Sequence, residues 1–239
     1  MRHTNALLAV SVAILLLWPI AAPPAANAQT EQQKPTVQIP EPGVPQIMTM
    51  EGRYVRAAYN NEGYVILGYQ LANNSVGGAW MLLEIGVTLM QKVPDYKLTR
   101  EAITLTTPDG TEVTLPTLEE FRNGKTQGLQ NQARVIKDSI DYFPPWVSSA
   151  SRLAFYVDLD HPGKAWDYAE LSPVRAALGR LYFNLPGGIQ YGQHWLNVKF
   201  EKSLVRVPFR ILTKEEAKYL DKNYKDISKQ VKEAFQPKK

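Results

Sequence analysis

The chain has 239 residues and no cysteine, and its 27 Lys and Arg against 23 Asp and Glu give a formal net charge of +4. Without cysteine, disulfides, thiolate catalysis and thiolate metal sites are excluded, so an apolar core must hold the fold together. The charge is too small to predict nucleic-acid binding, and the expected folded part contains no basic cluster with interleaved aromatic residues.

The first 28 residues predict a secretory signal peptide. Arg2 and His3 precede an apolar run over 6–18, and the Ala-Asn-Ala triplet at 26–28 fits the rule for cleavage before Gln29. The run is shorter than the roughly 20 residues of a membrane-spanning helix, so no transmembrane span is expected after cleavage. Because an export signal without cysteine is typical of bacterial proteins, we expect a periplasmic or secreted protein.

Residues 29–50 are polar and contain four prolines, which predicts an extended, disordered linker. The alternative is a proline-rich ligand for the groove of a partner protein. Folded structure is expected to begin at Arg53.

Alternating apolar residues predict a series of β-strands with one buried face. The runs at 54–59 and 64–71 flank an Asn-Asn-Glu-Gly turn, and those at 102–107 and 112–115 flank a Pro-Asp-Gly turn, so two hairpins are expected. Residues 80–90 are apolar on both faces of a strand. This pattern predicts a central strand that is covered on both sides.

A helical insertion is expected over about 117–140. Thr117 and Glu120 fit a capping box, and a second helical piece is predicted to run to about Asp138. The following residues, 141–148, contain two consecutive prolines and are expected to form a loop.

The remaining strands are predicted from three more alternating regions. Residues 153–159 indicate one strand, and the connection over 164–177 is expected to be irregular. The stretch 178–212 predicts three consecutive strands that share an apolar face. Pro208 cannot donate a hydrogen bond to a sheet, so the last strand is expected at an edge or bulge.

The last predicted element, within residues 213–239, is an amphipathic helix. A second capping box at Thr213 and Glu216 marks its start, and apolar residues then recur at spacings of three and four. We expect this helix to dock on the preceding domain, because its apolar stripe would otherwise lie in water. The alternative is that the stripe pairs with another protein or a second copy. Its distal residues are Tyr224, Ile227, Val231 and Phe235.

The sequence predicts about nine strands, and helices do not alternate with them as in βαβ units. This favours a mainly β fold, namely an antiparallel β-sandwich over 51–212. The segments GYVILGYQLANNS, AITLTTPDGTEV and GRLYFNLPGG followed by HWLNVKF resemble the strand pattern of telokin-like, immunoglobulin-type domains of bacterial exported proteins. The resemblance spans about 53–211, and the insertion over 117–149 departs from it. It implies an immunoglobulin-like sandwich associated with export, and no functional residues are carried over from it.

Catalytic and metal-binding motifs are sparse. His161 and His194 lie on different predicted strand ends, so no metal centre and no cofactor are expected, and His194 is interpreted as a hydrogen-bonded residue at the core boundary. The chain has no nucleophile elbow, phosphate-binding loop or dinucleotide fingerprint. Asp158 and Asp160 are predicted to project from the same strand face, which leaves open an acid–base pair or the start of a calcium site.

Several aromatic residues lie in the predicted loops and near the final hairpin, at positions where the pattern predicts polar, solvent-facing side chains. Exposed, they would stack on sugar rings or anchor a protein partner. The alternative is that they cap the ends of the sandwich. These residues are Tyr142, Phe143, Trp146, Trp166, Tyr191 and Trp195.

From these observations we expect an exported, non-enzymatic β-sandwich protein that binds or scaffolds other envelope or extracellular proteins. The alternative function is a carbohydrate-binding or carbohydrate-cleaving module that uses the loop aromatics and the pair Asp158 and Asp160.

Overall fold

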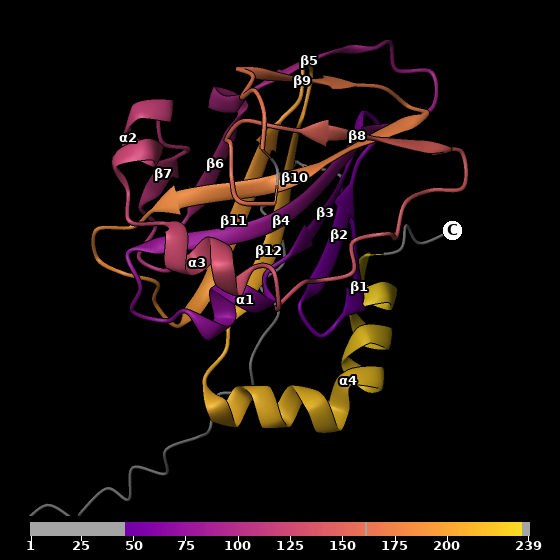
Figure 1. Cartoon of the computed structure of the whole chain (residues 1–239). Coiled ribbons are helices and arrows are strands. Elements are labelled where there is room, and N and C mark those ends of the chain that lie inside the picture. Colours follow the sequence, from indigo (N-terminus) through magenta and orange to yellow (C-terminus); the bar gives the residue numbers. More distant parts are fainter. Residues whose placement is uncertain (1–45, 161, 236–239) are drawn as a thin grey trace, which may run out of the picture. The chain divides into compact units, whose positions relative to one another are not determined.

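The computed structural model describes residues 46–160 and 162–235. The expected signal peptide and residues 29–45 of the expected linker lie outside this range, as does His161. The described residues belong to one compact unit and are mainly β, with a long helix at the C-terminal end (Figure 1). This agrees with the fold class expected from the alternating pattern.

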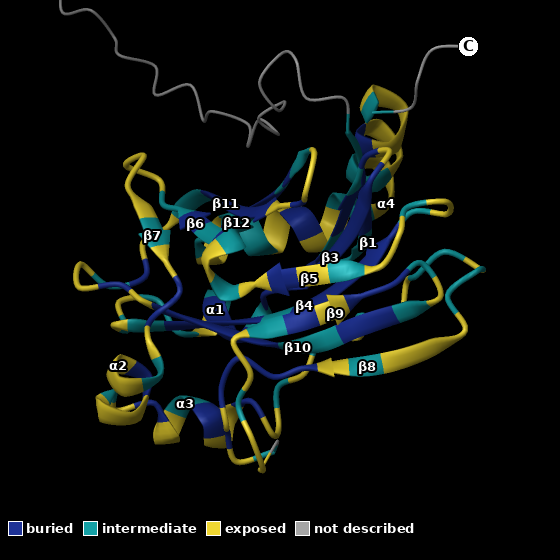
Figure 2. Ribbon diagram, turned by 90° about the horizontal axis from the view of Figure 1, so that it is seen from above, coloured by how far each residue is buried: buried dark blue, intermediate teal, exposed yellow. Residues whose placement is uncertain are grey.

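Six strands form the larger sheet. All neighbouring pairs are antiparallel except β10 and β8, which run parallel, so the expectation of a purely antiparallel domain is wrong for this pair. In sheet order the strands are β1 (Ile47–Gly52), β2 (Val55–Tyr59), β3 (Gly63–Gly68), β4 (Trp80–Leu89), β10 (Arg175–Asn184) and β8 (Ser149–Leu153). Figure 2 shows β8 at the exposed edge of this sheet.

A second sheet has four strands, and two further strands pair separately. The four are β12 (Leu204–Ile211), β11 (Gly192–Lys199), β6 (Ile103–Thr106) and β7 (Glu112–Thr114), and the pair consists of β5 (Tyr96–Thr99) and β9 (Tyr168–Leu171). Pro208 lies in the edge strand β12, as predicted. The connection over 164–177, expected to be irregular, contains β9 and the start of β10.

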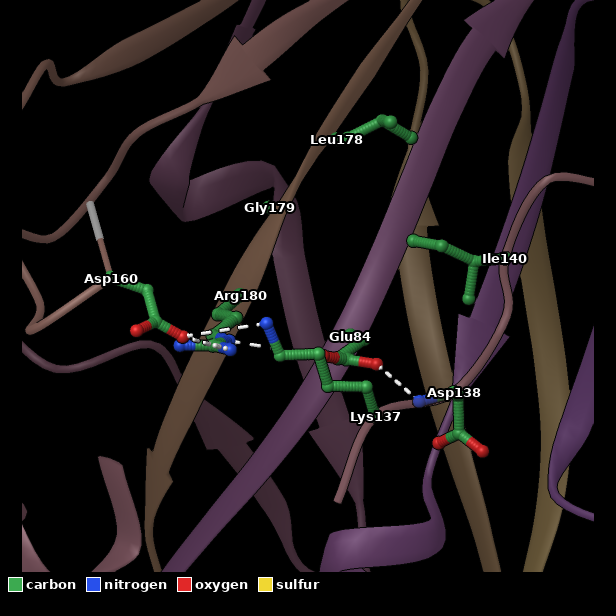
Figure 3. Close-up of a pocket in the computed structure, with 8 residues that line it drawn as sticks. All are labelled: Glu84, Lys137, Asp138, Ile140, Asp160, Leu178, Gly179 and Arg180. Carbon is green, nitrogen blue, oxygen red and sulfur yellow. Dashed lines mark hydrogen bonds and ion pairs between the residues drawn. The ribbon is translucent and has the colours of Figure 1, made fainter. Parts of the chain in front are cut away.

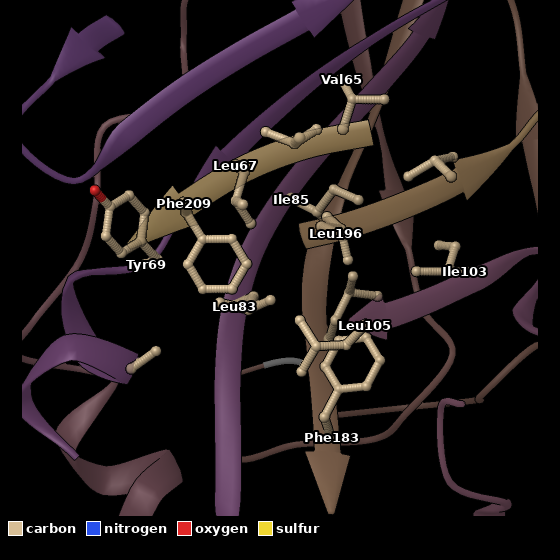
Figure 4. Packing of buried hydrophobic residues seen from close by; sticks show 14 of the residues in the cluster. Val65, Leu67, Tyr69, Leu83, Ile85, Ile103, Leu105, Phe183, Leu196 and Phe209 are labelled. Carbon is tan, nitrogen blue, oxygen red and sulfur yellow. The ribbon is translucent and has the colours of Figure 1, made fainter. Parts of the chain in front are cut away.

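The core lies between the two larger sheets in a sandwich-like arrangement. Leu83 and Ile85 of β4 belong to the same buried cluster as Leu196 of β11 and Phe209 of β12 (Figure 4). The three strands predicted within 178–212 therefore face a common core, but from two sheets rather than one, because β10 belongs to the larger sheet and β11 and β12 to the smaller.

The folded domain begins earlier than expected. The linker was predicted to extend to residue 50, but β1 starts at Ile47, and Met48 and Met50 are buried in the core. Just before this strand, the side-chain amide of Gln46 donates to the backbone oxygen of Arg206 (2.7 Å) and accepts from its nitrogen (3.0 Å). These two bonds fix the start of β1 against the free edge of β12.

The predicted helical insertion is shorter than expected. The capping box is confirmed, because the Thr117 hydroxyl accepts from the Glu120 nitrogen (3.1 Å) and the Glu120 carboxylate accepts from the Thr117 nitrogen (2.7 Å). It begins α2 (Leu118–Asn123), and α3 (Gln127–Gln132) follows. The extension to about Asp138 is wrong, because the Asp138 nitrogen donates to the carboxylate of Glu84 (2.7 Å) instead of to a helical carbonyl.

The strand predicted over 153–159 is also wrong. β8 ends at Leu153, and the consecutive side chains of Phe155 and Tyr156 are both buried, which a strand with one exposed face does not allow. The chain turns because the Asp158 carboxylate accepts a hydrogen bond from the Asp160 nitrogen (3.1 Å).

Three other helical elements are present. They are α1 (Gln70–Asn74), the short 3₁₀ turn η1 (Arg100–Ala102) and α4 (Lys214–Phe235). α1 occupies the end of the strand expected over 64–71, so β3 stops at Gly68. No helix among the described residues has both the length and the apolar character needed to cross a membrane.

The C-terminal helix α4 docks on the domain, as the first of the two interpretations predicted. Leu220 and Val231 are buried in the core cluster, and the hydroxyls of Tyr224 and Ser228 both donate to the backbone oxygen of Met50 in β1 (3.3 and 3.4 Å). Figure 1 shows α4 beside β1. Because the contacts involve both halves of the helix, the whole apolar stripe contributes to the domain's own packing.

A substitution in the distal half of α4 tests this docking. Val231→Ala should lower the free energy of unfolding by about 1–3 kcal/mol, because it removes two buried methyl groups. The neighbouring exposed residue provides the control, since Gln230→Ala should be close to neutral. Urea denaturation measures both. Equal stability of the two variants would mean that the distal half of α4 does not dock.

Candidate functional site

A cluster of charged side chains lies on the outer face of the six-stranded sheet. In β4 and β10 the residues that point away from the core include Glu84 and Arg180, which are direct cross-strand partners. Nε of Arg180 lies 3.8 Å from Oε1 of Glu84. The alternation of the two strands thus places an ion pair at the centre of the sheet, on the face opposite the core.

Arg180 also binds two irregular segments that cover this face. Its Nη1 lies 3.4 Å from Oδ2 of Asp158, and its Nη2 lies 2.9 Å from Oδ2 of Asp160. Nη2 also donates to the backbone oxygen of Ala133 (3.0 Å). The side chain of Arg180 is only 5% exposed, so one buried guanidinium joins β4, the segment after α3 and the segment 154–160.

Asp158 and Asp160 are brought together by the structure, but in a different way from that predicted. They lie on a turn, not on one face of a strand. The side chain of Asp158 is 3% exposed and accepts a hydrogen bond from the Tyr182 hydroxyl (2.9 Å). Asp160 accepts one from Nε of Arg134 (2.7 Å), and this bond, together with those from Arg180, lowers the pKa of Asp160 to about 2.

The segment after α3 lies in a trough that two glycines create. A Cβ at Gly68 would lie 2.5 Å from the Cβ of Asp138, and a Cβ at Gly86 would collide with the ring of Phe143. A side chain at either position would therefore force Asp138 or the Phe143 ring to shift. Phe143 and Ile140 pack here against a small apolar cluster that includes Tyr64 and is separate from the main core.

Asp138 occupies one end of this trough. Its carboxylate accepts a hydrogen bond from the backbone nitrogen of Gln70 (2.8 Å), and burial raises its pKa to about 6. Figure 3 shows the Asp138 carboxylate directed away from Arg180, while its nitrogen contacts Glu84. Together with Lys137 and Asp160, these residues line a depression of about 470 Å³.

The charges in this cluster neutralise one another. Arg180 is shared by three carboxylates, Arg134 binds Asp160, and Nζ of Lys137 lies 3.8 Å from Asp160. No group of three or more His, Asp or Glu residues is arranged to hold a metal ion within residues 46–160 and 162–235. The arrangement is therefore suited to fixing the two covering segments in place.

The two fixed segments expose apolar side chains beside this cluster. Val135 is 85% exposed, Val157 is 40% exposed and Leu159 is 38% exposed. Val135 follows Arg134 and Leu159 precedes Asp160, so the ion pair between Arg134 and Asp160 links the two segments that carry them. We call Val135, Val157 and Leu159 the valine–leucine patch. It was missed by the sequence reasoning, which assigned these residues to a helix and a strand.

The six aromatic residues singled out in the sequence do not form one surface. Trp195 is buried beneath the guanidinium of Arg206, and Phe143 and Trp146 are half-buried. The other three are exposed, but no ring contact joins any two of the six in the described part of the chain. The exposed residues are Tyr142, Trp166 and Tyr191.

The remaining predicted site residues serve the fold. Val231 is buried, and Tyr224, Ile227 and Phe235 are partly buried against the core, so the helix stripe packs on the domain itself. His194 is buried, as expected. Its ring stacks on Phe209, and burial lowers its pKa to about 4.

Glu84, Arg180 and Asp138 were missed by the sequence reasoning. The first two had a visible signal, because each is a lone charged residue inside a long apolar strand pattern. The sequence around Asp138 carried no such signal, because the burial of Asp138 depends on Gly68, which is distant in the sequence.

Comparison with known proteins supplies no family for this chain. Neither a protein-family model, nor a curated protein, nor a solved structure matches it.

Asp138 predicts a pH dependence of stability. Its pKa is about 6 in the folded chain, against an ordinary value of 3.8. The contribution of this carboxyl to the free energy of unfolding is therefore fully present below pH 3.8, and it is lost as the pH rises through 6. Asn keeps the oxygen that binds Gln70 but cannot ionise. Asp138→Asn should therefore be more stable than the wild type by about 1–3 kcal/mol at pH 7, and the gain should vanish near pH 4.

Asp160→Asn serves as a control of opposite sign. The pKa of Asp160 is lowered to about 2, so its contribution to stability is present above the ordinary carboxyl pKa and is lost only as the pH falls through 2. This variant should therefore be less stable than the wild type at pH 7. Thermal unfolding at several pH values measures both variants. A pH-independent effect of Asp138→Asn would contradict the buried, protonatable state of this carboxyl.

Proposed function

We propose that this chain is an exported, non-enzymatic β-sandwich protein that binds or scaffolds another exported or envelope protein through the valine–leucine patch. The observation that carries the proposal is the buried Arg180, which fixes both segments of the patch at once. A surface that is held in place before binding loses little conformational entropy when a partner binds. The export part rests on the pattern of the first 28 residues.

The composition of the patch suits a protein partner. It exposes three apolar side chains, and the exposed Arg134 and Lys137 belong to the same segment as Val135. An apolar centre with a charged, solvated border is the usual anatomy of a binding surface between proteins. Such a surface favours a partner with a small apolar centre.

We also propose that the domain belongs to the telokin-like, immunoglobulin-type class that its strand segments resemble. The support is that two sheets enclose one apolar core, and that the α-helices of the described residues are confined to the insertion, α1 and the C-terminal end. The parallel strand β8 is an addition to the expected pattern.

The arrangement of Asp158 and Asp160 argues against a catalytic role in sugar cleavage. A glycosidase needs one protonated carboxyl that donates to the leaving group. Asp158 is buried between Arg180 and Tyr182, and the low pKa of Asp160 keeps it ionised. We therefore assign this pair a positioning role.

The partner surface is tested by the double substitution Val135→Ser and Leu159→Ser. Both side chains are exposed, so unfolding stability should stay within about 0.5 kcal/mol of the wild type. Immobilised wild-type chain should retain a specific protein from an extract of the exported fraction, and the double variant should lose it. Mass spectrometry of the retained proteins measures this.

Val174→Ser is the matched control, because Val174 is 55% exposed and lies outside the patch. It should retain the same partner as the wild type. Identical retention by the double variant, or no retained protein in any sample, would refute the proposed function.

A further inference from the structure

A second concave surface borders α3 and shares no lining residue with the depression at the charged cluster. It is a groove of about 780 Å³ between the turn that follows α1, the end of α2 and α3. Figure 1 shows these three helices on one side of the domain. Its size falls within the range of roughly 300–1,000 Å³ that is usual for small-molecule sites.

Trp80, the first residue of β4, forms part of the groove wall. Its ring packs edge-on against Phe121, with 6.4 Å between the centroids, and a Cβ at Gly124 would collide with it. The indole is therefore held by Phe121 and Gly124, while the residue itself is only half-buried. A rigid aromatic face at the wall of a groove is suited to stack on a flat apolar surface of a ligand.

Amide side chains provide the polar part of the lining. None of them forms a side-chain hydrogen bond with another described residue, so their donors and acceptors are available to a ligand. Each amide offers both kinds of group, which matches neighbouring hydroxyls that donate and accept in turn. These residues are Asn74, Asn123, Gln132 and Asn184.

The groove carries little charge. Only Glu120 and Lys125 in its lining are ionisable, and the Glu120 carboxylate is engaged by the Thr117 nitrogen in the capping box. For a nucleotide or another polyanion, the lining offers a single lysine. For a polycation, it offers no cluster of carboxylates. The lining therefore favours a neutral ligand.

We propose that this groove binds a neutral oligosaccharide. The C–H face of a pyranose ring would stack on Trp80, and its hydroxyls would exchange hydrogen bonds with the four amides. This site differs from every sugar-binding surface expected from the sequence, since it contains none of the six predicted aromatics. It is also independent of the valine–leucine patch, because the two surfaces have no residue in common.

The test is calorimetric titration of the full chain with cellotetraose, chitotetraose and maltotetraose. At least one of them should bind with a stoichiometry of one. The double variant Asn123→Ala and Asn184→Ala should bind it at least about ten-fold more weakly, because two hydrogen bonds are lost. Asn131→Ala is the matched control. It lies on α3, is exposed and does not line the groove, so its affinity should be unchanged.

A blocking variant provides an independent check. A Cβ at Gly128 would meet no atom within 4 Å, so the backbone position accepts a side chain, and Gly128→Phe adds a ring to a residue that lines the groove. It should abolish binding while its circular dichroism spectrum stays that of the wild type. Absence of binding to all three sugars, or equal affinity of the wild type and Gly128→Phe, would overturn the proposal.

Discussion

The burial of one positive charge, that of Arg180, organises the most irregular part of this fold. A guanidinium taken out of water costs several kcal/mol unless oxygen atoms surround it on all sides. Here Glu84 comes from the neighbouring strand, but Asp158, Asp160 and the Ala133 oxygen come from segments without regular structure. The oxygen atoms of these segments accept the hydrogen bonds of the Arg180 guanidinium, and the guanidinium in turn fixes the path of the segments over the sheet.

The sequence was sufficient for long regular elements such as β4, β11 and α4 and insufficient for this region, for one physical reason. In β4, β11 and α4 the backbone is paired locally or in a ladder, so the period of the apolar residues reports the structure. Between residues 133 and 160, outside β8, two backbone nitrogens donate to distant side chains. Glu84 accepts from Asp138, and Gln130 accepts from Leu159 (3.0 Å). Apolar alternation over 153–159 therefore predicted a strand that does not form.

The same region separates two surfaces with different chemistry. α3 borders both, since Gln132 lines the amide-rich groove and Val135 follows three residues later in the valine–leucine patch. One surface has an apolar centre with charged neighbours, and the other has a tryptophan with neutral amides. Neither contains any of the six aromatic residues that the sequence singled out, and three of those are buried or half-buried in the fold.

Hydrogen exchange of Arg180→Lys tests most directly whether Arg180 fixes both segments. Lysine keeps the charge but cannot reach several carboxylates and a carbonyl at once, because it lacks the planar fork of donors. The account predicts that the amides of Asp138, Leu159 and Asp160 lose protection together, while those in the centres of β4 and β11 keep theirs. Unchanged protection of the three amides, or a uniform loss over the whole domain, would contradict it.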